Sequence, residues 1–454
     1  MQRDAIDFGK TRIGPLFVRL LVPTFLGLLF GALFNIADGI FVGRGVGSDA
    51  LAAVNVAAPM FMLFSGIALM FGTGVSVVCA IHLSKGSVKA ARINATQAFT
   101  VALLLGALLF AAAVFAPRQI NFLFGGSAVL EPYVCDYLRY GSVGMVGSLI
   151  AMFSLFVIRL DGSPRYAMLT NIVPALLNIF LDWLFVFPFN WGIKGAAAAT
   201  SISEMVCVAM VVIYFWKYAK TINFYRPKFS NKAIRLTLRN LGYMVRLGLP
   251  TFLGEGAMLC AMIVGNIMFM SRLREDGVAA YSVACYLFPL VFMFGNAVAQ
   301  SALPIVSYNH GLGQTARIRQ TFRLSTGTAA VCGLLLSGIV AAVSPALMFL
   351  FLGGAAGPTA IGNAGLPLYA TGFAFFSLNI VLIGFLQAIE RSKAATFFML
   401  LRGYLLVVPC FVALPSLIGD KGLWLAVPLS ETLTFAAMAT LFLLKKRELF
   451  GQKK

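Results

Sequence analysis

Charged residues are scarce in this chain, and acidic residues are the scarcest. Only 11% of its 454 residues are charged, whereas an average soluble domain has about 25%. Hydrophobic residues make up 60% of the chain, and the mean hydropathy is +0.90. Such a chain has too few polar side chains to cover a surface that faces water. We therefore expect a membrane protein, because lipid is the solvent that such a surface matches.

Residues that commonly carry enzymatic chemistry are also missing. The two histidines, His82 and His310, do not belong to an H-E-x-x-H sequence, and no G-x-S-x-G sequence occurs. The seven cysteines show no C-x-x-C spacing and lie mostly in apolar runs, which is typical of small buried hydrophobic side chains. The sequence therefore predicts no enzymatic activity, no metal centre and no cofactor.

Long apolar runs, in contrast, are abundant. A helix needs about 20 apolar residues to cross the hydrocarbon core of a bilayer, and the chain contains twelve suitable stretches. We expect transmembrane helices at residues 16–42, 51–80, 93–116, 134–158, 166–189, 193–217, 244–271, 278–307, 321–347, 366–389, 394–415 and 421–444. The predicted fold is an all-α polytopic membrane protein.

The net charge of +19 follows the predicted topology. With the N-terminus in the cytoplasm, seven of the 35 Lys and Arg residues fall on the outer side: Arg44, Arg118, Arg139, Lys194, Arg272, Arg274 and Lys421. The remainder alternate onto the inner side, loop by loop, as the positive-inside rule requires. The pattern predicts a multi-pass protein of a bacterial cytoplasmic (inner) membrane with both termini in the cytoplasm, and it argues against binding of nucleic acid.

The second half of the chain repeats the first. Residues 23–27 recur letter for letter as residues 250–254, and the same offset of 227 residues maps Ser203-Glu204 onto Ser430-Glu431. Each half contains an even number of predicted spans, so the halves enter the membrane with the same polarity. We predict an N-terminal six-helix lobe (residues 1–218), a cytoplasmic linker (219–243) and a C-terminal six-helix lobe (244–454), arranged around a central cleft that suits alternating access.

Polar residues gather at one depth of the N-terminal lobe. An ionisable side chain inside a membrane is costly and is a functional candidate by default. Helix rise places Asp38, Asp182 and Thr200 in the outer half of their spans, and Asn178 lies one turn from Asp182 on the same face. Two acids with an amide and a hydroxyl can hold either a proton or Na⁺. The alternative is that Asp38 only ends its span and meets water.

Three further acids, Glu204, Glu255 and Glu431, are expected near the midplane. Glu255 replaces Leu28 of the first half, so it is a polar addition to the second lobe. An acid at this depth can attract a cation or carry a second coupling proton, and the alternative is a salt bridge with Arg402. Glu204 and Glu431 are repeat partners, which favours a shared role in packing or hydrogen bonding.

These motifs together resemble the multidrug and toxic compound extrusion (MATE) family over nearly the whole chain. The resemblance rests on Asn35-x-x-Asp38-x-x-Phe41-Val42-Gly43, on Asn178-x-x-x-Asp182, and on the Gly192-x-x-Gly195 segment that leads to Thr200. It implies an efflux antiporter driven by H⁺ or Na⁺, with Asp38, Asn178, Asp182 and Thr200 as the ion site. In some members an acid at the position of Glu255 serves coupling beside an acid in span 10. Here the nearest polar residues in that span are Asn379 and Gln387.

The function we expect is export of small amphipathic cations or drugs by a monomer. Glu255, Asn35 and Gln387 are the candidate substrate residues of this interpretation. A lipid-linked precursor flippase with a related two-lobed fold is the alternative, although Lys and Arg rather than acids are expected in its cleft. A membrane protein without transport activity is the remaining possibility.

Overall fold

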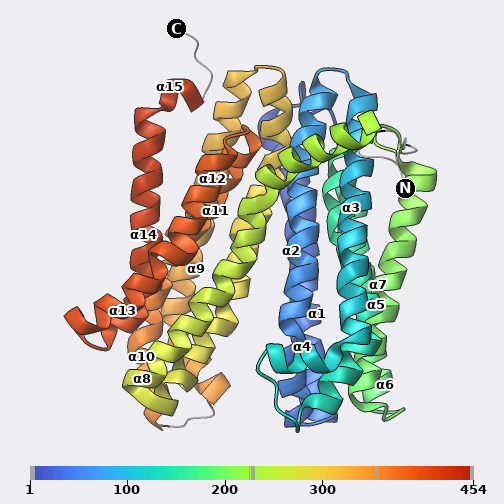
Figure 1. Cartoon of the computed structure of the whole chain (residues 1–454). Coiled ribbons are helices and arrows are strands. Elements are labelled where there is room, and N and C mark those ends of the chain that lie inside the picture. The colour runs from blue at the N-terminus through green and yellow to red at the C-terminus, as the bar shows by residue number, and fades with distance from the viewer. Residues whose placement is uncertain (1–5, 224, 226–230, 353–355, 450–454) are drawn as a thin grey trace. The chain divides into compact units, whose positions relative to one another are not determined.

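The computed structural model describes residues 6–223, 225, 231–352 and 356–449, and these residues contain helices but no strand (Figure 1). The helices are α1 (Ile13–Gly45), α2 (Ser48–Ser84), α3 (Val88–Phe115), α4 (Pro117–Leu123), α5 (Glu131–Leu160), α6 (Pro164–Val186), α7 (Gly192–Ile213), α8 (Asn231–Gly311), α9 (Thr315–Leu352), α10 (Ala356–Ala370), α11 (Phe373–Ala388), α12 (Ser392–Leu400), α13 (Val407–Ile418), α14 (Lys421–Leu444) and α15 (Lys446–Leu449). Two π-helical turns, η1 (Tyr214–Tyr218) and η2 (Leu401–Leu405), complete the set. All-helical structure satisfies every backbone group locally, which a chain in lipid requires.

The predicted all-α polytopic fold is confirmed. Among the described residues, eleven helical segments are long and apolar enough to cross a membrane. One of them, within α8, contains two of the twelve predicted spans, 244–271 and 278–307. The backbone between these spans breaks at Arg274, whose φ of 53° and ψ of −150° are not helical. The twelve predicted spans are therefore all accounted for.

The chain divides into two compact units whose limits differ from those of the predicted lobes. Among the described residues, the first unit consists of residues 6–7 and 22–248. The second unit consists of residues 8–21 and of the chain from Leu249 onward. Residues 8–21 therefore belong with the second unit, although the predicted N-terminal lobe was 1–218. The described part of the predicted linker (219–243) lies in the first unit, and its residues 224 and 226–230 are outside the described residues.

Side-chain hydrogen bonds explain both differences. In the second unit, Arg317 Nη2 donates to the carbonyl oxygens of Phe8 and Thr11 at 2.9 and 2.7 Å. In the first unit, the carboxylate of Asp161 accepts from the backbone N–H groups of Thr221 and Ile222 at 2.8 and 2.9 Å. A sequence repeat records homology, whereas these contacts decide which bundle holds each connecting segment.

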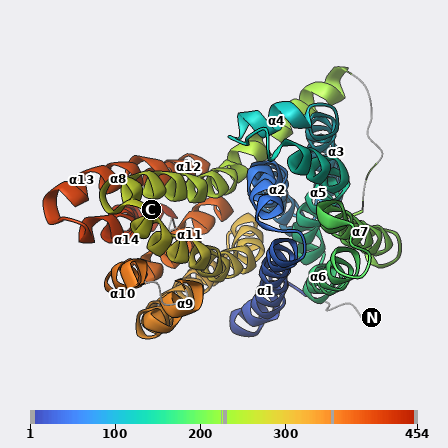
Figure 2. The same ribbon diagram turned by 90° about the horizontal axis from the view of Figure 1, so that it is seen from below.

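The first unit is a bundle in which α2, α3, α5, α6 and α7 pack against one another, and Figure 2 shows this group viewed along the helices. One of its apolar clusters joins α5, α6 and α7 through Ile158, Ala167, Cys207 and Tyr214, all of them buried. This packing positions the inner faces of α6 and α7, which carry the polar residues predicted to bind an ion.

The second unit packs α9, α10, α11, α13 and α14 together with part of α8. An aromatic cluster fills one part of its interior, where the rings of Phe269 and Tyr281 stack at 4.5 Å and Trp424 meets Phe269 edge-on at 5.0 Å. Such ring pairs add to the energy of apolar burial. All seven cysteines of the chain are unpaired thiols.

Candidate functional site

Asp38 and Asp182 lie together in the first unit. Asp38, in the second half of α1, is 8% exposed, and Asp182, in α6, is completely buried. The two carboxyl groups interact electrostatically, and the phenol of Tyr137 on α5 interacts with both. Three helices thus contribute ionisable side chains to one buried place.

Asn178 and Thr200 complete the polar group around Asp182. Both are buried, on α6 and α7 respectively. With its amide oriented so that both ends are satisfied, Asn178 donates to Asp182 Oδ2 at 2.7 Å and accepts from the backbone N–H of Thr200 at 3.2 Å. The hydroxyl of Thr200 donates to the carbonyl oxygen of Ala196 at 3.2 Å. The structure therefore brings together all four residues that the sequence predicted as an ion site; their role in coupling stays a prediction.

One oxygen of each acid is left without a partner. Oδ1 of Asp38 and Oδ1 of Asp182 are buried and accept no hydrogen bond from any described residue. Neither carboxyl group forms an ion pair with a described Lys or Arg. A buried carboxylate without a counter-charge is strongly disfavoured, so the arrangement favours uptake of a cation. A proton satisfies one oxygen directly, and a hard cation such as Na⁺ prefers oxygen ligands of these kinds.

No larger metal centre is visible in the described part of the chain. Within it, no three side chains of His, Cys, Asp or Glu stand close enough to hold a metal ion. The candidate site is thus a two-acid site with amide and hydroxyl neighbours.

The predicted substrate residues occupy different surroundings. Asn35 is exposed on α1, and its amide donates to the carbonyl oxygen of Gly31 at 3.0 Å. In the second unit, Gln387 is buried in α11 and donates to Thr251 Oγ1 at 3.0 Å. Thr251 stands one helical turn before Glu255, so Gln387 lies near the turn of α8 that carries this acid. Their binding of substrate stays a prediction.

The suggested salt bridge between Glu255 and Arg402 is wrong. Arg402 instead pairs with Glu431, with Nη2 at 2.8 Å from Oε1. Glu255 is partly exposed on α8 and makes no ion pair or hydrogen bond with a described residue. Depth alone placed Arg402 within reach of several acids, and only the packing of α14 against η2 selected Glu431.

Glu204 and Glu431 also differ in their partners, although the repeat predicted a shared role. Glu204 accepts a hydrogen bond from Ser148 of α5 in the first unit. Glu431 accepts from both Arg402 and Asn379 in the second unit. The two halves have therefore kept the acid and changed what it binds.

Sequence reasoning missed Tyr137 at the acid pair. This residue is 4% exposed and stands near the outer end of the predicted span 134–158. The outer end is also the level predicted for Asp38 and Asp182, and that common depth was the available signal. A buried phenol beside two acids can donate a hydrogen bond to a carboxylate or accept one from a protonated carboxyl group.

The family model described as MatE matches the chain twice, over residues 23–184 and 251–412. A curated relative, the "Multidrug export protein MepA" of Staphylococcus saprophyticus, is 24% identical over 446 residues, which cover 97% of this chain and 96% of the relative. The "FAD transporter" of Shewanella oneidensis is 27% identical over 443 residues, covering 95% of this chain and 94% of that protein. Among solved structures, the MATE multidrug transporter DinF-BH superposes with a TM-score of 0.87 at 26% identity, over the whole of both chains.

Proposed function

This chain belongs to the MatE family of membrane transporters, and from that premise we propose that it is a secondary antiporter. It exports organic cations or drugs in exchange for H⁺ or Na⁺ by alternating access. Support for export comes from relatives of nearly equal length, one described as a multidrug export protein and one as a multidrug transporter. A chain with eleven described membrane-length segments, one of them double, is a multi-pass membrane protein and suits this role.

The observation that carries the ion-coupling part is the acid pair of Asp38 and Asp182. Each has a buried oxygen without a partner, and no described cation neutralises either. Such a pair is stable when a cation arrives and unstable when it leaves. A site of this kind can therefore make one conformation depend on the presence of the coupling ion.

The cationic nature of the cargo rests on acids rather than on a bound molecule. Glu255 is partly exposed and has no counter-charge among the described residues of the second unit. An unneutralised acid on a membrane helix attracts organic cations and repels anions.

A second candidate cargo is flavin adenine dinucleotide (FAD), because the Shewanella relative is described as an FAD transporter. Of the two curated relatives named above, it has the higher sequence identity to this chain.

We further place the chain in a bacterial cytoplasmic membrane as a monomer, with both termini in the cytoplasm. The support for this orientation is that Lys and Arg are concentrated on alternate loops. Only seven of the 35 Lys and Arg residues fall on the outer side.

Transport driven by separate gradients tests the proposed function. The purified protein is reconstituted into proteoliposomes, which are loaded with a fluorescent organic cation. Either a pH gradient or a Na⁺ gradient is then imposed across their membrane. We expect cation movement to follow one of the two gradients and to stop when that gradient is dissipated. FAD is offered in parallel. Movement of FAD with no movement of the cation would replace the proposed cargo, and movement of neither under both gradients would contradict antiport.

Replacing Glu255 by Gln tests the attraction of cations. The change removes one negative charge with almost no change in volume, so we expect export of a cationic dye to fall about tenfold, which corresponds to about 1.4 kcal/mol. Export of a neutral dye of similar size should change little. The two rates are measured in the same proteoliposomes. Equal losses for both dyes would show that Glu255 supports the structure of α8 rather than the choice of cargo.

A further inference from the structure

The second unit contains a buried ion pair that the ion site does not use. Arg402, in the π-helical turn η2, and Glu431, in α14, have side chains that are each only 5% exposed. Arg402 Nη2 donates to Glu431 Oε1 at 2.8 Å, and Arg402 Nε lies 3.0 and 3.2 Å from Oε1 and Oε2. The pair is therefore close to the forked geometry that makes such contacts strong.

Neighbouring side chains complete the surroundings of this pair. Asn379 of α11 donates to Glu431 Oε2 at 2.6 Å and to the Glu431 carbonyl oxygen at 2.9 Å. The guanidinium carbon of Arg402 stands 4.3 Å from the ring centre of Phe376, a cation–π contact. The phenol of Tyr369 on α10 also interacts electrostatically with Glu431. Both oxygens of Glu431 thus have partners, unlike Oδ1 of Asp38 and of Asp182.

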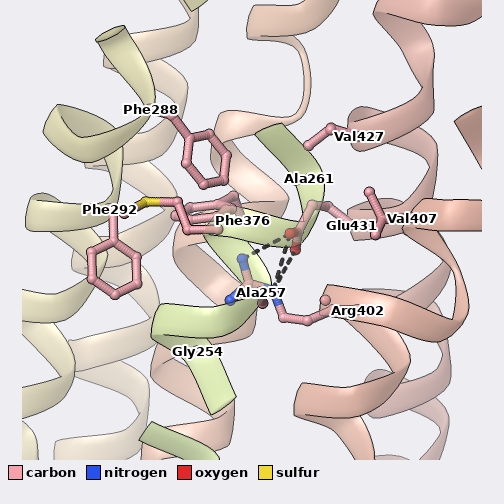
Figure 3. A pocket seen from close by; sticks show the side chains of 12 residues that line it. Gly254, Ala257, Ala261, Phe288, Phe292, Phe376, Arg402, Val407, Val427 and Glu431 are labelled. Atoms are coloured by element: carbon pink, nitrogen blue, oxygen red, sulfur yellow. Dashed lines mark hydrogen bonds and ion pairs between the residues drawn. The ribbon is translucent and has the colours of Figure 1, made fainter. Parts of the chain in front are cut away.

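The pair borders a small cavity of about 20 Å³, which has room for about one water molecule. Figure 3 shows Arg402 and Glu431 facing each other at this cavity, with Phe288, Phe292 and Phe376 beside them. Gly254 also lines it, and the acid next in sequence is Glu255. The remaining lining is apolar, so Arg402 is the cation that the cavity presents to Glu431.

The repeat shows that the second half lacks the acids of the first half's ion site. At the offset of 227 residues, Asp38 falls on Gly265 and Thr200 falls on Val427. Asn178 and Asp182 fall on Leu405 and Pro409 at the same offset. None of these four can bind a cation through its side chain. Both halves kept an acid at this position, Glu204 in one and Glu431 in the other. Among the described residues, only Glu431 has an arginine partner.

Stability alone does not explain a buried pair of this kind. Desolvation of two charges offsets most of their attraction, and apolar residues of the same size are often as stable. Removing only one partner is strongly destabilising, however, because an uncompensated charge stays buried. An arginine beside a buried acid therefore has one specific consequence: the acid no longer needs a cation from solution.

We propose that Arg402 is a built-in counter-cation that permanently occupies the carboxylate of Glu431, so that only the first unit takes up the coupling ion. This inference rests on the proposed function of Asp38 and Asp182 and assigns Arg402 a positioning role. It predicts that loss of Arg402 converts Glu431 into a new site that responds to protons and Na⁺. The converted site would use the oxygens of Glu431 and the space that the guanidinium vacates.

The test measures thermal melting of the purified full chain in detergent. All variants carry Asp38→Asn and Asp182→Asn, which silence the first unit's acids. We compare the background with Arg402 intact, Arg402→Met, Arg402→Met with Glu431→Gln, and Arg402→Met with Glu204→Gln. The last is a matched control, because it makes the same acid-to-amide change at the repeat-related position. Each variant is melted at about pH 5.5 and at about pH 8. Both values lie above the ordinary pKa of an exposed Glu side chain. Each measurement is made once with Na⁺ and once with choline as the cation of the buffer.

Between the lower and the higher pH, we expect the melting temperature of Arg402→Met to fall by about 5–10 °C more than that of the background with Arg402. The sign follows from the charge: a buried neutral acid is tolerated, whereas the buried anion formed as the pH rises keeps only the hydrogen bond from Asn379 and has no counter-charge. Na⁺ should recover part of the loss and choline should not. Glu431→Gln should return the dependence on pH and Na⁺ to that of the background that keeps Arg402, and Glu204→Gln should leave the dependence added by Arg402→Met in place.

A pH dependence above that of the background that survives Glu431→Gln, or the absence of such an added dependence from Arg402→Met, would overturn the proposal. Arg402→Lys keeps the charge and serves if Arg402→Met yields no folded protein. Its melting should depend on pH no more than that of the background with Arg402, and an added dependence on pH that Glu431→Gln removes would show that charge at this position does not occupy the acid.

Transport separates this inference from the proposed function. With Asp38 and Asp182 intact, the variant Arg402→Met with Glu431→Gln should still export cations under the driving gradient within about twofold of the original rate, about 0.4 kcal/mol. A complete loss of ion-driven export in this folded variant would contradict the confinement of coupling to the first unit. Failure of the Asp38 and Asp182 variants to affect export would instead contradict the proposed function.

Discussion

Replacing Asp182 by Asn is expected to abolish ion-driven export, and replacing Asp38 by Asn should have the same effect. Both carboxyl groups are buried in the first unit, and each has one oxygen that no described residue satisfies. An amide of the same shape carries no charge, so it neither takes up a proton nor attracts Na⁺. We expect each variant to lose at least about a hundredfold in gradient-driven rate, about 2.7 kcal/mol.

The measurement is dye export from proteoliposomes under the gradient that drives the original protein. Asp136→Asn provides a matched control: Asp136 precedes Tyr137 in sequence, is 31% exposed, and pairs with Lys194 at 3.4 Å outside the site. Exposed ion pairs contribute little, so this variant should export at nearly the original rate. Undiminished export by both Asp38→Asn and Asp182→Asn, in folded protein, would remove the acid pair from the mechanism.

Asn in place of Asp182 should also change how stability depends on the ion. In the original protein, a cation that binds only the folded state raises the melting temperature with its concentration. Once the acids are replaced, this rise should disappear, while the hydrogen bond between positions 178 and 182 is retained by the amide. If the melting temperature no longer rises with the cation, but is unchanged when no cation is added, the acids bind the ion. A lower melting temperature without the cation would indicate a purely structural role.

Replacing Gly248 by Ala should have the largest effect on folding. A β-carbon at Gly248 would collide with the carbonyl oxygen of Met70 on α2, and one at Gly74 would collide with the carbonyl oxygen of Met244 on α8. The two glycines therefore let α2 and α8 approach backbone to backbone within the first unit, as small residues do in membrane bundles. Backbone cannot move aside as a side chain can, so we expect a loss of about 3 kcal/mol or more.

Gly242 offers the matched control on the same helix, because a β-carbon there would meet no atom within 4 Å. Gly242→Ala should be neutral or slightly stabilising, since alanine has the higher helix propensity by about 1 kcal/mol. The yield of monodisperse protein and its melting temperature in detergent decide the outcome. Equal melting of the Gly248 and Gly242 variants would show that α2 and α8 can separate at little cost.

The membrane fold was open to prediction because it depends on composition that extends over whole segments. Each predicted span needs only a long apolar run, and lipid leaves such a run no choice but a helix. The acids of the first unit were predictable for a related reason. Helix rise converts residue number into depth, so Asp38, Asp182 and Thr200 could be placed at one level before any packing was known.

Depth does not determine which helices are neighbours, and the errors arise there. A salt bridge of Arg402 with Glu255 was the alternative interpretation of that acid because both lie in the second lobe, yet Arg402 pairs with Glu431. Tyr137 was overlooked because a tyrosine in an apolar run carries no signal until α5 is placed beside α1 and α6. The repeat predicted a shared role in packing or hydrogen bonding for Glu204 and Glu431, but it could not predict the different partners of the two acids.

The order of residues along the chain thus established a polytopic, duplicated membrane protein and the level of its buried acids, because apolar length, charge bias and helix rise are local quantities. Three-dimensional packing alone decided that Asp38 and Asp182 are both buried in the first unit, each with one oxygen that accepts no hydrogen bond from a described residue. It also decided that Arg402 neutralises Glu431 and that residues 8–21 belong to the second unit. These outcomes depend on which helix faces meet, and a helix face is selected by the summed fit of many side chains from distant parts of the chain.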